Sequence, residues 1–151
     1  VQAQRMYFRR QLEIARDFDL PVVLHARRAV EEVLATIRGV GRLRGVVHSY
    51  AGSEEQARQL FGLGFLLGIG GPVTYDRAKR LRRVVSTVPL ECLLLETDSP
   101  DQPDSLHRGQ RNEPALIVTV LETVAGLRRM DPGAVADATC ENAQRLFGVA
   151  S

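Results

Sequence analysis

The sequence predicts an α/β protein built on a parallel sheet, and three observations support this. Short apolar segments alternate with helix-like segments along all 151 residues. Four of the apolar segments end about one β/α unit apart, at His25, His48, near Gly70 and at Asp98. These segments are continuous apolar runs, which is typical of parallel strands that are buried on both faces. We therefore expect one domain over residues 1–151.

The first half of the chain is expected to contain three helices and three strands. Apolar residues recur at helical spacing in the first two helices, and Gly39 and Gly41 end the second one. Ser53, with Gln56 three residues later, matches a capping box at the start of the third helix. The predicted elements are, in order, helix 2–17, strand 21–25, helix 28–38, strand 45–48, helix 54–61 and strand 64–69.

The second half is expected to contain a fourth strand and three more helices. Pro89 begins the turn into the strand, and Pro114 suits the first turn of a helix. Asp131 and Pro132 start the final helix, which ends near Gly148. The predicted elements are helix 75–85, strand 91–97, a long polar loop over 98–112, helix 113–129 and a last helix from 131 to about 148.

Composition excludes some classes of protein and leaves others open. No segment reaches the run of roughly 18 apolar residues that a membrane-spanning helix needs. The two cysteines, Cys92 and Cys140, do not suggest a disulfide framework, so a cytoplasmic location is expected. The net charge of +2 does not indicate a partner. The basic run over residues 77–83 is interpreted either as a solvated helix face or as a surface that contacts phosphate.

Residues of the kinds that bind metal ions stand at the ends of three predicted strands. His25 and His48 end the first two strands, and Glu96 and Asp98 lie at the end of the fourth. Because strand side chains alternate between faces, Glu96 and Asp98 are expected on one face, with Glu96 one layer deeper. A buried carboxylate is costly unless it is paired or bound to a cation. The pattern therefore suggests a metallohydrolase centre at the carboxyl ends of the strands.

Five motifs follow one another across nearly the whole chain. They are PVVLHAR over 21–27, HSYAGS over 48–53, LETDSP over 95–100, GQRNEP over 109–114 and TCENAQRLF over 139–147. With these motifs the chain resembles the C-terminal part of the TatD-family metal-dependent hydrolases, also called TatD-type deoxyribonucleases, within the amidohydrolase superfamily. The resemblance implies that the four strands are strands five to eight of a TIM (β/α)8 barrel, followed by C-terminal helices.

The resemblance also implies roles for individual residues. His25, His48 and Asp98 would bind divalent metal ions, with Mg, Mn and Zn as candidates, and Glu96 would support them through hydrogen bonds. The metal would activate a water that attacks a phosphodiester bond of DNA, and Asp98 would also accept a proton from that water. Three further residues would contact substrate phosphate or order the loop over the site: Arg27, Arg111 and Asn112.

Part of the family pattern is not found in this sequence. The resemblance implies a His-x-His at the end of strand one and a Glu at the end of strand four, and the chain holds neither. A barrel of this type typically needs about 250 residues. We therefore expect the second half of a barrel, with the N-terminal half absent and two exposed sheet edges. Such edges favour pairing with the N-terminal half or self-association.

Two other functions remain open from the residues alone. A related amidohydrolase would use the same ligands on a C–N or ester bond. A non-catalytic half-barrel would bind a partner or assemble through its sheet edges. The RNEP and NAQRLF segments favour the TatD-type nuclease over the amidohydrolase, whereas the missing ligands favour the half-barrel for this chain by itself.

Overall fold

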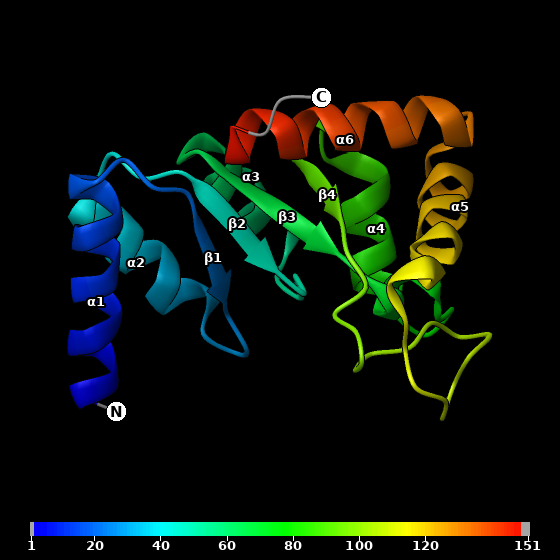
Figure 1. Ribbon diagram of the computed structural model, residues 1–151, viewed down its shortest axis with the longest axis horizontal. Coiled ribbons are helices and arrows are strands. Elements are labelled where there is room, and N and C mark those ends of the chain that lie inside the picture. Colours follow the sequence, from blue (N-terminus) through cyan, green and yellow to red (C-terminus); the bar gives the residue numbers. More distant parts are fainter. Residues whose placement is uncertain (1, 149–151) are drawn as a thin grey trace.

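The computed structural model describes residues 2–148 and shows an α/β protein with a four-stranded parallel sheet (Figure 1). The strands lie side by side in the order in which they occur in the chain. They are β1 (Val22–His25), β2 (Gly45–His48), β3 (Phe65–Ile69) and β4 (Leu93–Leu95). The predicted α/β class and parallel pairing are confirmed. Residues 1 and 149–151 of the predicted domain lie outside the described residues.

Helices connect the strands and continue the chain beyond the last strand. They are α1 (Gln2–Asp17), α2 (Val30–Val40), α3 (Glu54–Gly62), α4 (Lys79–Thr87), α5 (Ile117–Arg128) and α6 (Pro132–Phe147). Three short 3-10 turns accompany them: η1 (Gly71–Thr74), η2 (Leu90–Cys92) and η3 (Pro114–Leu116). No helix within residues 2–148 combines the length and the apolar character that crossing a membrane requires.

The main hydrophobic core lies between one face of the sheet and, mainly, helices α1 to α5. Val47, Leu67 and Leu93 point to this face from three neighbouring strands and are almost fully buried. Leu34 and Ile37 of α2 meet the core from the helical side. Each such side chain stabilises the fold by about 1.5–3 kcal/mol when it leaves water. This core therefore fixes the sheet on which the site is built.

The opposite face of the sheet is covered only in part, by α6. Every second strand residue points to this face, and Val46, Leu66 and Leu94 pack there against Leu146. Figure 1 shows α6 running across the end of the sheet at which the strands begin. Val23 of β1 lies on the same face and keeps 61% of its surface exposed. This open face is therefore buried near β4 and exposed near β1.

The helix ends follow the signals in the sequence. The Ser53 hydroxyl accepts a hydrogen bond from the Gln56 backbone at 3.2 Å, and the Gln56 side chain accepts one from the Ser53 backbone at 2.9 Å. The predicted capping box of α3 is therefore confirmed. Asp131 caps α6, and Pro132 stands at its first position. Gly148 ends α6 with a φ of +68°, which glycine adopts without strain.

Several predicted elements have different bounds in the structure. The helix predicted over 75–85 is α4, which begins only at Lys79 because η1 and a turn come first. The helix predicted over 113–129 opens with η3. The strand predicted over 91–97 starts as η2, and only β4 pairs with β3. Asp98 consequently lies beyond the strand with a φ of +59°, so strand alternation does not set its direction.

Candidate metal centre

The parallel register brings His25 and His48 side by side at the carboxyl ends of β1 and β2. The two residues are partners in the β1–β2 ladder, two positions after Val23 and Val46. Their side chains therefore point to the open face of the sheet. Nδ1 of His25 and Nε2 of His48 are 2.7 Å apart. The structure thus brings the first two predicted ligands together.

Glu96 and Asp98 complete this group from the other side of β3. The Nδ1 atom of His48 is 3.7 Å from Oε1 of Glu96 and 3.9 Å from Oδ1 of Asp98. Glycine at position 68 leaves room for the approach, because a Cβ there would contact the Glu96 carboxylate and lie 2.9 Å from the His48 Cα. Both predicted carboxylates consequently reach the same histidine.

Glu96 is positioned as a hydrogen-bond acceptor in the middle of the group. The Ser49 backbone N–H donates to its Oε1 at 2.5 Å. Burial raises the pKa of Glu96; the N–H of Ser49 and the nearby His48 oppose the rise, and Asp98 adds to it. A carboxyl group that burial disfavours as an anion gains from a neighbouring cation. Glu96 is therefore suited to support a bound metal ion.

Asp98 is held by a polar network that the sequence did not indicate. Its Oδ2 accepts hydrogen bonds from the Ser49 hydroxyl at 3.4 Å and from the Gln102 side-chain amide. The same amide donates to the Ser49 hydroxyl at 2.8 Å. For Ser49 the only available signal was its place directly after His48. Gln102 could not be found, because its contact depends on how the loop over 98–112 folds back onto β2.

The donor set fits a divalent metal ion, although its side chains are not yet arranged around one point. Imidazole and carboxylate groups are the ligands of many catalytic zinc sites and also suit Mn. Two nitrogens on one tetrahedral zinc ion are about 3.4 Å apart, whereas those of His25 and His48 are 2.7 Å apart. Within residues 2–148, no three His, Cys, Asp or Glu side chains already form a metal-binding group. Binding of one ion by both histidines would therefore require their ring nitrogens to move apart.

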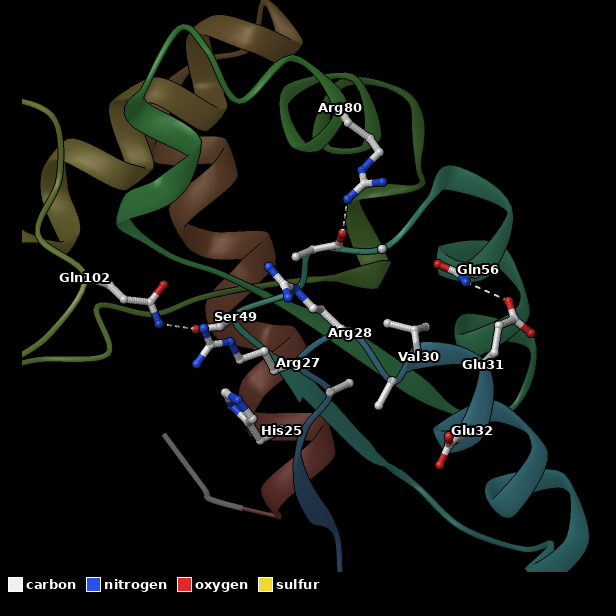
Figure 2. Close-up of a pocket in the computed structure, with 14 residues that line it drawn as sticks. His25, Arg27, Arg28, Val30, Glu31, Glu32, Ser49, Gln56, Arg80 and Gln102 are labelled. Carbon is white, nitrogen blue, oxygen red and sulfur yellow. Dashed lines mark hydrogen bonds between the residues drawn. The ribbon is translucent and has the colours of Figure 1, made fainter. Parts of the chain in front are cut away.

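A pocket of about 910 Å³ opens beside His25 at the same end of the sheet (Figure 2). Ser49 and Gln102 form part of its wall, which joins the pocket to the network around Asp98. Arg27, which was predicted to bind substrate, also lines it. A cavity of this size accommodates a ligand much larger than one phosphate group. The pocket is therefore the candidate substrate site next to the candidate metal ligands.

Asn112 orders the loop over 98–112 from within. Its side chain is buried, and Nδ2 donates to the backbone oxygens of Thr97 and Asp101 at 2.7 Å each. Of its two predicted roles, the geometry favours loop ordering over contact with substrate. Arg111 is exposed on the same loop and, among the described residues, is not part of the pocket wall.

Asp104 is a second buried group that fixes this loop. Its carboxylate accepts hydrogen bonds from the backbone N–H groups of Leu106 and His107 at 2.9 and 3.1 Å, and lies 3.0 Å from Nδ1 of His107. Burial acts to raise the pKa of Asp104, but these hydrogen bonds, with that of the His107 side chain foremost, hold it below its usual value. The loop over the site is therefore anchored by an ionised carboxylate.

Known proteins resemble this chain along nearly its whole length. The model of the family described as TatD related DNase matches residues 1–148. YjjV of Escherichia coli K12 is 40% identical over 140 residues, and YabD of Bacillus subtilis is 38% identical over 148 residues. Both are named as uncharacterised metal-dependent hydrolases. The matches cover 92% and 97% of this chain but 54% and 58% of those proteins, so the chain spans a little over half their length.

Solved structures agree with the matches in sequence. The crystal structure of Escherichia coli YjjV, a TatD homologue, superposes with a TM-score of 0.85 at 38% identity, over 93% of this chain and 54% of that one. A TatD-family hydrolase from Entamoeba histolytica gives a TM-score of 0.76 at 20% identity, over 91% and 55% of the two chains, which is a likeness of fold alone. On its motifs, its fold and these matches, the chain belongs to the TatD related DNase family.

Proposed function

We propose that this chain forms one half of a TatD-type deoxyribonuclease, a metal-dependent hydrolase of DNA phosphodiester bonds, and supplies part of its metal centre. The observation that carries the proposal is the meeting of His25, His48, Glu96 and Asp98 beyond the carboxyl ends of three parallel strands. The relatives YabD and YjjV are named metal-dependent hydrolases, which supports the proposal. Mg, Mn and Zn are the candidate ions for such a set of nitrogen and oxygen ligands.

Each side chain of the centre has a role in the proposed reaction. A divalent cation held by His25, His48 and Asp98 would lower the pKa of a water and offset charge on the phosphoryl oxygens. Asp98 accepts the proton that the attacking water loses. Glu96 accepts a hydrogen bond from the Ser49 N–H and lies beside His48, so it orients the imidazole ring of His48.

The proposal includes the completion of the barrel. The chain would supply strands five to eight, and the N-terminal half, in the same polypeptide or in another one, would supply the rest. Two observations support this: β1 is an edge strand with an exposed apolar residue, Val23, and the chain spans a little over half the length of its relatives. Full activity would then belong to the completed barrel.

Nuclease assays on this chain together with the N-terminal half, which we call the full-length protein whether one polypeptide or two, and on this chain alone test the proposal. Single- and double-stranded DNA are supplied with Mg²⁺, Mn²⁺ or Zn²⁺ in turn. Asp98→Asn is expected to lower kcat by about 100-fold or more, because it removes both a ligand and the proton acceptor. Asp101→Asn changes an exposed carboxylate of the same loop and serves as the matched control. The nuclease proposal is wrong if the full-length protein cleaves no DNA with any of these ions, or if Asp98→Asn keeps full activity.

A second candidate function is a non-catalytic half-barrel that binds a partner. One observation favours this function: within residues 2–148, no three His, Cys, Asp or Glu side chains are arranged so that they could hold a metal ion. Calorimetric titration of the full-length protein with Mn²⁺ separates the two functions. Binding that His48→Ala abolishes supports the enzyme, and no binding supports the half-barrel. The alternative function of a related amidohydrolase is tested by offering an amide and a carboxyl ester as substrates in the same activity assays.

A further inference from the structure

The pocket beside His25 carries three guanidinium groups next to the metal centre. Arg27 and Arg28 follow β1, and Arg80 lies in the first turn of α4. In Figure 2 the three groups are spread along the pocket, from Arg27 near Ser49 to Arg80 on the far side. Such a row suits a ligand with several negative charges along its length better than a single small anion.

The carboxylates in the pocket wall are already engaged with other groups. Glu31 accepts a hydrogen bond from the Gln56 side chain at 2.6 Å, and Glu32 forms an ion pair with Arg5 at 2.8 Å. None of the three pocket arginines forms an ion pair with a carboxylate within residues 2–148. Unpaired guanidinium groups in a concave site raise the local concentration of anions. The pocket therefore favours an anionic ligand.

Arg80 is held differently from its neighbours on α4. Its Nη2 donates to the backbone oxygen of Ala51 at 2.8 Å, which fixes the guanidinium at the pocket wall. A guanidinium has five N–H donors, so most of those of Arg80 stay available. Arg82 also donates to a backbone oxygen, that of Val73 at 3.0 Å, but Arg82 and Arg83 both form ion pairs with carboxylates outside the pocket, at 3.4 and 3.8 Å. The basic residues over 77–83 therefore do not share one environment, and Arg80 is the one that lines the candidate substrate site.

Arg28 has a backbone conformation that few residues other than glycine adopt. Its φ is +54°, in the turn between β1 and α2. Figure 2 shows its side chain extending across the pocket toward the side on which Arg80 lies. Such conformations cost free energy and occur often at binding sites. Arg28 and Arg80 thus approach the pocket from two separate elements.

We propose that Arg28 and Arg80 form a second phosphate subsite, which binds the backbone phosphate next to the scissile one in a nucleic-acid strand. The inference rests on the proposed function, which places the scissile phosphate at His25, His48 and Asp98. Guanidinium groups bind phosphate through paired, charge-assisted hydrogen bonds. The volume of about 910 Å³ admits more than one nucleotide phosphate. The site thus selects an oligonucleotide over a substrate with one isolated phosphodiester.

Binding of a fluorescently labelled oligonucleotide to the full-length protein, followed by anisotropy at several salt concentrations, tests the subsite. Arg28→Gln and Arg80→Gln are each expected to weaken binding about tenfold. Each is also expected to reduce the slope of log K against log salt by about 0.7, the value for one phosphate contact to a single strand. Lys79→Gln removes the same charge from α4 outside the pocket wall and is expected to change binding less than about twofold.

Hydrolysis separates this inference from the proposed function. The ratio of kcat/KM for the oligonucleotide to kcat/KM for bis(p-nitrophenyl) phosphate should fall about tenfold in each arginine variant. If the unchanged protein hydrolyses neither substrate, the proposed function fails, and the anisotropy result still decides the subsite. The subsite is wrong if both arginine variants bind like Lys79→Gln. It is equally wrong if inorganic pyrophosphate displaces the oligonucleotide at similar concentrations, because the pocket then serves a small phosphorylated molecule.

Discussion

Glu96, which follows β4, contacts His48 and Ser49 at the end of β2. It accepts the Ser49 N–H at 2.5 Å and lies 3.7 Å from His48, while burial raises its pKa. A partly buried carboxylate of this kind is stable as an anion only when hydrogen bonds or a cation compensate its lost hydration. Under the proposed function, a metal ion bound beside His48 and Asp98 would supply this compensation.

Replacing Glu96 with Gln should therefore weaken metal binding. The amide keeps the size of the side chain but removes the charge, and we expect the Kd for Mn²⁺ to rise at least about tenfold in the full-length protein. Isothermal titration calorimetry measures this directly. Glu91→Gln, an exposed residue before β4, is the control. An unchanged Kd in Glu96→Gln would show that Glu96 has no part in holding the metal.

Asn142 is a buried polar residue that joins α6 to the start of β4. Its Nδ2 donates to the backbone oxygens of Leu90 and Leu93 at 3.0 and 2.9 Å. Asn142→Ala leaves both carbonyls without this partner and should lower the free energy of unfolding by about 1–3 kcal/mol. Urea denaturation measures the loss, and Glu141→Ala, on the exposed side of α6, should change stability by less than about 0.5 kcal/mol.

Asp104 should make the loop over 98–112 sensitive to acid. Its folded-state pKa is held below the usual value, so its contribution to stability is complete above the unfolded pKa of about 3.9. That contribution is lost as the pH falls through the lower, folded value. We expect the difference in unfolding free energy between the unchanged protein and Asp104→Asn to be constant above about pH 5 and to shrink below about pH 4.

Urea denaturation between pH 3 and pH 7 measures this difference. The comparison with Asp101→Asn, whose side chain is exposed in the same loop, separates the effect from general acid unfolding. A difference for Asp104→Asn that stays constant down to pH 3 would mean that the carboxylate does not stabilise the loop as an anion.

At the scale of elements, sequence signals located the segments whose ends depend on local chemistry. The capping box of Ser53 and Gln56 is one such signal, because its hydrogen bonds join residues three apart. The start of α4 and the shortness of β4 were missed. The first depends on η1, and the second on how few residues of the fourth strand find partners in β3. Tertiary pairing, which no short window of sequence reports, decides the length of β4.

β3 contributes to the site at Gly68, where the absence of a side chain leaves room for Glu96 and His48. A Cβ on Gly68 would come within 2.8 Å of the Glu96 carboxyl carbon and 2.9 Å of the His48 Cα. We expect Gly68→Ala to displace Glu96, lower stability by about 1–3 kcal/mol and weaken Mn²⁺ binding. Gly62→Ala is the matched control, because a Cβ at that position, at the end of α3, would meet no neighbouring atom within 4 Å. Thermal unfolding and calorimetry of both variants decide whether the bare backbone at position 68 is required.

At the scale of the whole molecule, the strand ends made the meeting of the candidate ligands predictable, whereas the residues around them were not. A ligand-type residue after an apolar strand is visible in the sequence, and parallel pairing then sets His25 beside His48. Gln102 and Arg80 reach the site through contacts with Ser49 and Ala51, each separated by many residues in the chain. Such contacts depend on the packed fold, so only the structure identifies these two residues.

The open face of the sheet leads to the last prediction. Val23, in the middle of edge strand β1, is 61% exposed and lines an apolar hollow of about 460 Å³ that continues to α6. An apolar edge strand of this kind favours pairing with another chain.

We expect this chain alone to self-associate at micromolar concentration, as measured by sedimentation velocity. Val23→Lys should shift it toward the monomer, because a lysine on an edge strand opposes pairing. Ile14→Lys replaces a comparably exposed residue of α1, 55% exposed, and should leave association unchanged. A monomeric chain that unfolds cooperatively at low micromolar concentration would contradict the prediction, and with it the proposal that this half of the sheet requires a second half.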